Sequence, residues 1–281
     1  MRAPADMASG RAADYDGPMP TTVQDLSDAN YVESIREHAR WQNPCELVEQ
    51  DGLLLVAGPN AFPAAYRNCV VRVDQRVPAK DTLARARDFF GSRRRGFTVI
   101  TRDSRDSDLA SFLPAAGLKP FGDSPCMLIE APLAEPRIPA DVRVERFSDV
   151  RHVLDAVEIN AEAYEAIKLP PHEARVYFGR PERLLSPNVE GYVAYRASRP
   201  ASTALTIFSG DGAGVYWVGT ANGAQRRGLA EICTRLATNA GFARGAKVVT
   251  LQASPFGEPI YQRLGYRTYD RTRRFMELPA K

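Results

Sequence analysis

One stretch of the sequence restricts the fold more than any other, because it combines a strand, a loop and the start of a helix. Residues 214–220 are apolar and rich in β-branched and aromatic types, which favours a strand. After a loop at 221–228, apolar residues recur from Leu229 with the spacing i, i+3, i+4 and i+7, which places one apolar stripe along a helix. The stretch therefore predicts a helix that begins directly after a strand ends.

The loop between this strand and this helix has the properties of an anion site. The first N–H groups of a helix have no partner within the helix, and the aligned peptide dipoles make that end positive. Gly228 removes a side chain that would keep a phosphate away from the backbone. Arg226 and Arg227 add forked, positively charged donors. These residues predict a phosphate or pyrophosphate site; the alternative is an exposed basic helix cap without a ligand.

The same loop has neither the three close glycines of dinucleotide-binding proteins nor the Gly-Lys-Ser/Thr end of a P-loop. Through Gln225, Gly228 and Ala230 it resembles the Gln/Arg-x-x-Gly-x-Gly/Ala motif of the GNAT superfamily of N-acetyltransferases. The resemblance implies that acetyl-CoA is the co-substrate. The residues that it assigns to the pyrophosphate are Gln225, Arg226, Arg227, Gly228, Leu229 and Ala230.

In that superfamily, acetyl-CoA lies in a V between two neighbouring parallel strands, which here correspond to residues 216–220 and 248–253. Strands that separate leave backbone groups that need partners. By the resemblance, the pantetheine chain pairs with the backbone of Val218, Gly219 and Thr220. Gly219 would permit a bulge or a close approach there. The alternative is an ordinary glycine at a strand end.

A second motif, Tyr-x-x-Leu-Gly-Tyr at 261–266, resembles the motif that closes the GNAT domain. Tyr261 then matches the tyrosine that often protonates the departing thiolate, a task that suits a phenol that is neutral at pH 7. The alternative is a packed tyrosine beside Leu264. Ser254 stands where relatives often have an asparagine that binds the coenzyme, and Pro259 fits the first turn of a helix. Ser254 is therefore a candidate coenzyme ligand.

The sequence leaves open which group takes the proton from the attacking amine. Acetyl transfer by direct attack requires a base, acting directly or through water. The strand at 214–220 carries no carboxylate, and no acyl-enzyme nucleophile is implied. The candidate bases are Glu190, Asp211, Glu258 and His172.

The order of the expected elements resembles the GNAT fold over about residues 141–279: a strand, two helices, three antiparallel strands, a helix, a strand, a short helix and a strand. An internal repeat extends the resemblance to the first half. Residues 96–101 resemble 245–250, and 117–121 resemble 265–269, each about 148 residues apart. The expected fold class is α/β (α+β), with two GNAT-like domains, each a mixed, mostly antiparallel sheet flanked by helices.

Composition shifts along the chain set the expected boundaries. Residues 1–23 predict a disordered tail, and residues 24–130 the first GNAT-like domain. Three prolines at 131–141 predict a linker. Residues 142–281 then form the acetyl-CoA-binding domain.

The first domain lacks the phosphate loop and is expected not to bind coenzyme. Where residues 225–230 should recur, the chain has residues 76–81, without a glycine. Pro78 removes a donor N–H group, and Asp81 would place a negative charge beside a phosphate. We expect Asp81 to cap a helix that begins at Thr82.

Overall composition limits the partners. The net charge of +3 over 281 residues is too small to favour nucleic acid or a membrane surface. No apolar run approaches the roughly 18 residues of a membrane span. The four cysteines and three histidines are scattered, which favours buried free thiols, no metal site and a cytoplasmic setting.

These observations predict an N-acetyltransferase whose C-terminal domain moves an acetyl group from acetyl-CoA to a small-molecule or peptide amine. One alternative is a regulatory module that binds CoA or an acyl-CoA without turnover, and another is an interaction scaffold. The sequence does not specify the acceptor or exclude a homo-oligomer. Residues 169–188 are expected to line the acceptor site, with Arg175, Tyr177 and Arg180 as recognition groups.

Overall fold

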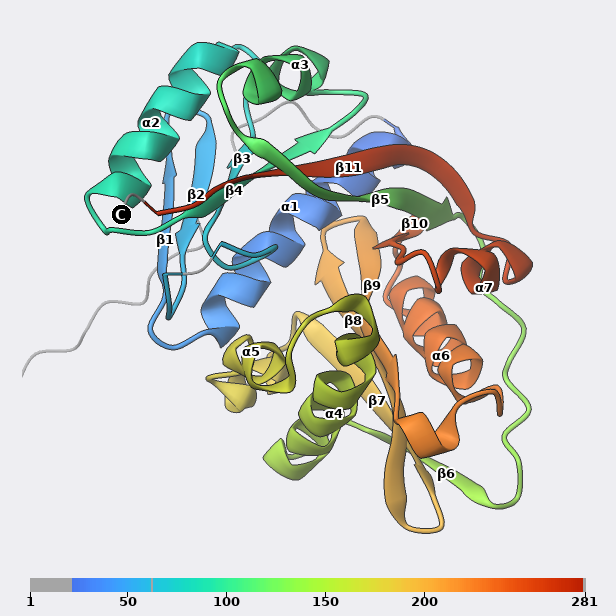
Figure 1. Ribbon diagram of the computed structural model, residues 1–281. Coiled ribbons are helices and arrows are strands. Elements are labelled where there is room, and N and C mark those ends of the chain that lie inside the picture. The colour runs from blue at the N-terminus through green and yellow to red at the C-terminus, as the bar shows by residue number, and fades with distance from the viewer. Residues whose placement is uncertain (1–21, 62, 280–281) are drawn as a thin grey trace, which may run out of the picture.

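The computed structural model describes residues 22–61 and 63–279 and joins the strands of both halves in one sheet (Figure 1). The order of its 11 strands is β1-β2-β3-β4-β11-β5-β10-β9-β8-β7-β6. Their bounds are β1 Glu46–Gln50, β2 Leu53–Ala57, β3 Cys69–Arg72, β4 Phe97–Arg102, β5 Lys119–Ile129, β6 Val142–Arg146, β7 Val189–Arg196, β8 Arg199–Ser209, β9 Gly212–Thr220, β10 Val248–Gln252 and β11 Arg267–Glu277. Among these strands, β3 with β4 and β9 with β10 pair in parallel, and the other pairs are antiparallel. The predicted mixed, mostly antiparallel strand pairing is confirmed, but the strands form one sheet shared by both halves rather than one sheet in each.

Helices cover both faces of this sheet. The α-helices are α1 Val23–Trp41, α2 Ala79–Gly91, α3 Ser107–Ala115, α4 Val150–Ala163, α5 Pro171–Val176, α6 Leu229–Ala243 and α7 Glu258–Arg263, and the 3₁₀ turns are η1 Tyr164–Ile167, η2 Pro181–Leu185 and η3 Asn222–Ala224. Val215 of β9 packs with Ile232 of α6, whereas the next residue, Tyr216, packs with Val157 of α4. Because successive strand residues face opposite sides, α6 and α4 cover opposite faces. Among the helices of the described residues, none meets the length and hydropathy that a bilayer-spanning helix requires.

Helix α1 lies across the middle of the molecule and contacts both halves (Figure 1). Ile35 is fully buried in a cluster with Val71 of the first half. On the second half, the Asn30 amide donates to the Ile207 carbonyl at 3.0 Å and accepts from the Tyr216 hydroxyl at 2.8 Å. The first helix therefore packs as much on the second half as on its own.

The two halves also exchange their last strands, which the sequence did not predict. Strand β5 ends the first half but pairs with β10, where Ile129 lies opposite Val249. Strand β11 ends the second half but pairs with β4, where Phe275 lies opposite Val99. The two exchanged strands also pair with each other, so the sheet runs unbroken through both halves.

Most predicted elements are present, with corrections at their ends. The helix predicted at 24–40 is α1, and Thr22 caps it through a capping box with Asp25. The predicted cap at Asp81 is wrong: α2 begins at Ala79 after Pro78, so the Asp81 carboxylate lies in its first turn. Most of the predicted tail, residues 1–21, lies outside the described residues.

Met127 tests how far the two halves depend on each other. This β5 side chain is fully buried in the core cluster beneath α6, which belongs to the second half. We expect Met127→Ala to lower the free energy of unfolding by roughly 2–5 kcal/mol, because it opens a cavity in the shared core. Urea denaturation followed by circular dichroism should still show one transition.

The matched control is Phe121→Ala, on the same strand but 42% exposed, which should cost about 1 kcal/mol or less. Two separate transitions in the Met127→Ala protein, with only one of them shifted, would contradict a shared core.

Candidate functional site

The carboxyl ends of β9 and β10 separate after a short contact. Their parallel register joins residues 212–214 to residues 248–250. Beyond this contact β9 continues to Thr220, with β8 as its ladder partner. Parallel strands end at the same edge of a sheet. The expected V therefore opens at the edge where the β9–α6 loop begins.

A bulge in β9 lies next to this opening. Tyr216 pairs with Leu205 and Gly219 with Thr203, so that Trp217 and Val218 together oppose one β8 residue. Trp217 has a φ of 51°, in the left-handed region that bulky residues rarely adopt. The sequence predicted a bulge near Gly219, and the structure places it at the two preceding residues.

Gly219 has a different role, which is to allow a close approach. A Cβ atom at this position would lie 2.4 Å from Oδ1 of Asn160 on α4. The side chain of Asn160 is 1% exposed, and its Oδ1 has no hydrogen-bond partner within the described residues. Glycine thus lets α4 lie directly against the end of β9.

The loop that follows β9 is held at one point and open elsewhere. The Asn222 N–H donates to Oε1 of Glu162 on α4 at 2.7 Å, and Gln225 donates to the Asn222 side chain at 3.1 Å. Gly228, the N-cap residue of α6, has a φ of 75°, and a Cβ there would meet nothing within 4 Å. Because glycine offers no side-chain acceptor, the first N–H groups of α6 are left for another partner.

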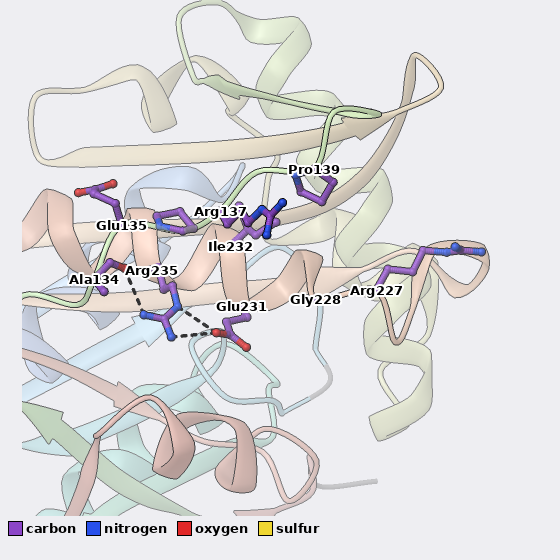
Figure 2. Close-up of a pocket in the computed structure, with 10 residues that line it drawn as sticks. Ala134, Glu135, Arg137, Pro139, Arg227, Gly228, Glu231, Ile232 and Arg235 are labelled. Atoms are coloured by element: carbon purple, nitrogen blue, oxygen red, sulfur yellow. Dashed lines mark hydrogen bonds and ion pairs between the residues drawn. The ribbon is translucent and has the colours of Figure 1, made fainter.

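A cavity of about 380 Å³ lies at this end of α6, between the helix and the linker (Figure 2). The linker is tied to α6 by Asn239, which bonds both backbone groups of Leu133 at 2.8 and 2.9 Å. Arg137 of the linker and Arg227 of the loop both line the cavity. Within residues 22–61 and 63–279, neither guanidinium forms an ion pair, whereas Arg235 pairs with Glu231 at 2.9 Å.

Arg137 was missed by the sequence analysis. Its neighbours are prolines, and proline density predicts only a spacer. The contact between linker and helix brings its charge to the α6 N-terminus, 90 positions away along the chain from Arg227.

Tyr261 lies on α7 and packs half-buried against the core beneath α6. Burial raises the pKa of its phenol above the usual value, so the hydroxyl stays protonated at neutral pH. Its ring centroid is 6.0 Å from that of Tyr266, and a Cβ on Gly257 would lie 2.8 Å from the Tyr261 ring. Within the described residues the Tyr261 hydroxyl makes no hydrogen bond, which leaves it available to a ligand.

A second tyrosine, Tyr164 in η1, was also missed. Burial raises the pKa of its phenol, and the neighbouring Tyr261 phenol adds to this effect. Its ring centroid lies 5.0 Å from that of Trp217 in the bulge. Tyr164 has no sequence motif, and only the packing of η1 brings it to the strand and to α7.

Ser254 shapes the loop before α7. Its hydroxyl accepts from the Gly257 N–H at 3.1 Å, and its carbonyl accepts from the Glu258 N–H at 3.0 Å. The helix begins at Glu258, with Pro259 in its first turn as predicted. The coenzyme contact of Ser254 stays a prediction, made by a hydroxyl that still has its own proton to donate.

The candidate bases are already engaged elsewhere. Glu190 accepts from the Tyr192 hydroxyl at 2.6 Å. Asp211 pairs with Lys247 at 2.7 Å, at the end of the sheet opposite the V. His172 is 76% exposed beside Glu173, and Glu258, in the first turn of α7, accepts from the Gln262 side chain at 3.4 Å. The geometry singles out none of them.

The predicted recognition groups of the acceptor segment have structural partners instead. Tyr177 is 3% exposed and its hydroxyl donates to the Ala65 carbonyl at 2.5 Å, so the prediction that it lines an open site was wrong. Arg175 makes a forked ion pair with Glu158 at 2.6 and 2.8 Å. Arg180 donates to the Asn43 side chain at 3.2 Å. These contacts join the segment to the rest of the protein.

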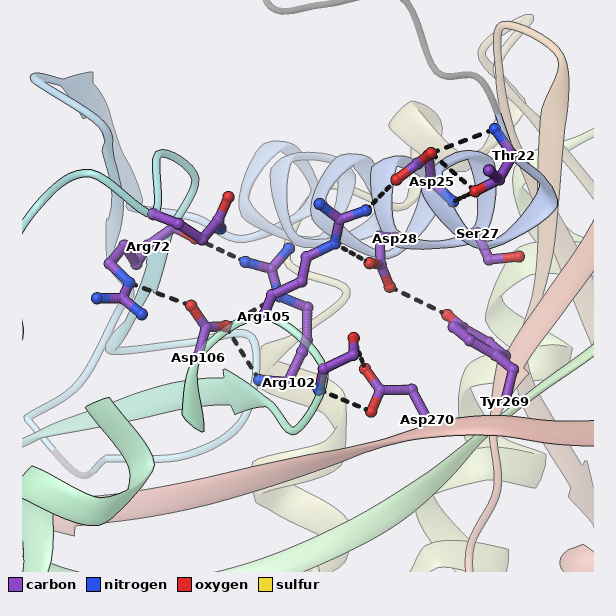
Figure 3. Close-up of polar contacts among 12 residues, drawn as sticks. Thr22, Asp25, Ser27, Asp28, Arg72, Arg102, Arg105, Asp106, Tyr269 and Asp270 are labelled. Carbon is purple, nitrogen blue, oxygen red and sulfur yellow. Dashed lines mark hydrogen bonds and ion pairs between the residues drawn. The ribbon is translucent and has the colours of Figure 1, made fainter. Parts of the chain in front are cut away.

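The equivalent edge of the first half is closed by charged side chains (Figure 3). Arg72 ends β3, Arg102 ends β4, and Asp106 lies between them at 3.1 Å from each guanidinium. Arg102 also donates to the Arg72 carbonyl at 2.7 Å. Arg72 and Asp106 are 1% and 0% exposed. The ends of β3 and β4 are therefore bonded to each other where those of β9 and β10 stand apart.

Comparison with solved structures identifies the fold. A GCN5-related N-acetyltransferase from Kribbella flavida has a TM-score of 0.68 at 20% identity, over 90% of this chain and 96% of that one. The chain has the GNAT fold. A tandem GNAT protein from the clavulanic acid biosynthesis pathway has a TM-score of 0.63 at 14% identity, over 92% of this chain and 97% of that one.

A third structure of this fold is a GCN5-related N-acetyltransferase from Sphaerobacter thermophilus, with a TM-score of 0.60 at 16% identity over 89% of this chain and 86% of that one. The GNAT fold thus extends over both halves of the chain. No family model matches the sequence, and no curated protein matches it.

The buried network of the first half gives a stability prediction. Asp106→Ala leaves the buried Arg102 guanidinium without its carboxylate partner, while Arg72 keeps its ion pair with Asp108. We expect the free energy of unfolding to fall by about 3–5 kcal/mol, measured by urea denaturation.

The matched control is Asp103→Ala, which removes a partly exposed carboxylate 2.7 Å from Arg273 and should cost about 1 kcal/mol or less. Equal losses in the two variants would show that the network does not hold β3 and β4 together.

Proposed function

We propose that the protein is an acetyl-CoA-dependent N-acetyltransferase that works in its C-terminal half. The observation that carries the proposal is the opening between β9 and β10, which ends at a helix N-terminus without a side-chain cap, beside arginines that form no ion pair with any residue that the structure describes. An open strand edge suits the amide groups of a pantetheine chain, and the α6 N-terminus suits its pyrophosphate. Arg137 adds a cation on the linker side of the same site.

The chemistry follows from the position of Tyr261. Acetyl-CoA supplies the acetyl group as a thioester, and an uncharged amine attacks its carbonyl carbon. As the C–N bond forms and the C–S bond breaks, the Tyr261 hydroxyl donates its proton to the departing sulfur. A phenol kept neutral by burial holds that proton at neutral pH. The amine proton leaves to water, from which Tyr261 is reprotonated.

The first half is proposed to have lost the coenzyme site. Arg72, Asp106 and Arg102 fill the strand ends where a coenzyme would enter. In the loop before α2, Arg76 pairs with Asp74 at 2.7 Å, which cancels a charge that a phosphate would need. The position equivalent to Tyr261 by the repeat is Leu113, which is fully buried and has no proton to give.

The acceptor is proposed to be a small-molecule or peptide amine, and neither nucleic acid nor a membrane is proposed as a partner. The alternative function is a regulatory module that binds CoA or an acyl-CoA without turnover. The observation that favours this alternative is that Glu190 and Asp211 bond to other groups, while the remaining candidates, Glu258 and His172, lie beside Gln262 and Glu173, so that the geometry singles out no base.

Titration calorimetry with acetyl-CoA tests the proposal. We expect one equivalent to bind, and Gly228→Glu to abolish binding because it puts a carboxylate at the anion site. The matched control is Gly245→Glu at the other end of α6: both glycines have left-handed φ, 75° and 87°, and open space around them. Equal affinity of the two variants for acetyl-CoA refutes the site. Binding of two equivalents by the parent protein refutes a first half that is closed to the coenzyme.

The same titration tests the contribution of the linker. Arg137→Ala should weaken acetyl-CoA binding roughly three- to tenfold, since it removes a charge-assisted contact to a phosphate. Arg94→Ala, at an exposed arginine in the turn after α2, should leave the affinity unchanged. Unchanged affinity in both variants means that the linker takes no part in binding.

Tyr261→Phe tests the proton donor once an amine substrate is found. We expect kcat to fall about 10²- to 10⁴-fold with the Kd for acetyl-CoA kept, because only the acid is lost. The control is Tyr266→Phe, whose hydroxyl lies 2.6 Å from Thr238 and not in the site. A Tyr261→Phe enzyme as fast as the parent removes this residue from the mechanism.

A further inference from the structure

The bulge residue Trp217 is held in its strained conformation by an aromatic cluster. Its ring centroid lies 5.0 Å from that of Tyr164, 5.4 Å from Tyr177 and 4.7 Å from Phe178. All three belong to the segment after α4. A left-handed backbone at a bulky residue persists only when its surroundings determine it, and such residues gather at functional sites.

A further contact of Trp217 comes from the first half. Its indole Nε1–H donates to Nε2 of His38 on α1 at 2.7 Å. His38 is fully buried, and its Nδ1 lies against the Ser34 carbonyl. An indole nitrogen is a donor only and a carbonyl is an acceptor only, so His38 is the neutral tautomer with its proton on Nδ1.

The surroundings of His38 keep the ring in this state and orientation. Burial lowers the pKa of His38 to about 4, so that Nε2 can accept a hydrogen bond at neutral pH. Its ring stacks on Tyr66 with centroids 4.2 Å apart, and Trp41 lies at 4.5 Å. Both of these residues also belong to the first half. Residues of the first half thus hold the imidazole in place, and it presents a single acceptor atom, Nε2, to Trp217.

We propose that His38 is a positioning residue for the coenzyme strand: by accepting from Trp217 it holds the β9 bulge, and with it residues 218–220, in the conformation that binds the pantetheine chain. The inference rests on the proposed function. It gives the first half a role in the reaction although its own strand edge is closed. The competing explanation is that His38 fills space, in which case its hydrogen bond is irrelevant to coenzyme binding.

Three variants separate these explanations by titration with acetyl-CoA. His38→Leu keeps much of the volume and loses the acceptor, and Trp217→Phe keeps a ring and loses the donor. Each should raise the Kd about tenfold, the effect of one lost hydrogen bond. His38→Gln keeps an acceptor oxygen near the position of Nε2 and should stay within about twofold of the parent.

The double variant His38→Leu with Trp217→Phe gives the decisive comparison. If the two residues act through one hydrogen bond, its Kd should match that of either single variant. If the two single effects on the Kd multiply in the double variant, the proposal is wrong and packing explains the effects. The same holds if His38→Leu and His38→Gln weaken binding equally. In each variant, kcat at saturating acetyl-CoA should change much less than the Kd, because Tyr261 is untouched.

Fluorescence supplies a readout that does not depend on turnover. The sequence has two tryptophans, Trp41 and Trp217, and both rings contact His38. Trp41→Phe removes an indole N–H that is buried without a hydrogen-bond partner among the described residues, and it leaves Trp217 as the single tryptophan emitter. Acetyl-CoA should shift the Trp217 emission in this background, and His38→Leu should change both the free spectrum and the shift.

The outcomes distinguish this inference from the proposed function. If the parent protein binds acetyl-CoA but His38→Leu and Trp217→Phe bind it equally well, the positioning role is wrong and the proposed function stands. If the parent protein binds neither acetyl-CoA nor free CoA, the proposed function is wrong and the positioning role falls with it. Circular dichroism of each variant confirms that the comparison is made between folded proteins.

Discussion

The short parallel contact between β9 and β10 is the feature on which the candidate site depends. Three residue pairs join the strands and end at Gly214, and the bulge at Trp217 follows three residues later. Had the ladder continued, the backbone groups of 218–220 would be satisfied within the sheet and unavailable to a ligand. Because parallel strands end at one edge, the opening, the β9–α6 loop and α7 come together there.

The first half shows what the same fold becomes when this edge is closed. At the ends of β3 and β4, two arginines share the buried carboxylate of Asp106. Burying charges costs free energy unless each finds its partner, and here the two guanidinium groups and the carboxylate pair with one another. One fold therefore occurs twice in the chain, once with its strand ends apart and once with them bonded together.

The second half nevertheless depends on the first. Strand β5 completes its sheet, Met127 enters its core, and α1 reaches β9 through Asn30 and His38. The net stability of a folded protein is small compared with the terms that make it up. An element that supplies core packing and buried hydrogen bonds to a neighbouring site can therefore be indispensable without binding anything itself.

Much of the fold was accessible from the sequence, since helices and strands follow from the local spacing of apolar residues. The α6 stripe from Leu229, the strand at 97–100 and the repeat of 117–121 at 265–269 all carried such signals, and each corresponds to an observed element. The exchange of β5 and β11 carried no signal, because either strand presents a similar apolar pattern to any neighbour.

For the site, the sequence by itself determined the residue types of the loop: Gly228 at a helix start, with Arg226 and Arg227 beside it. A motif of this kind is contiguous and needs no tertiary information. Only the tertiary structure decided that Arg137 lies at the start of α6, that His38 bonds to Trp217, and that Tyr177 is buried in the aromatic cluster around Trp217. These residues are brought there by packing between distant segments, and a contact between distant segments leaves no periodicity in a single sequence from which it could be inferred.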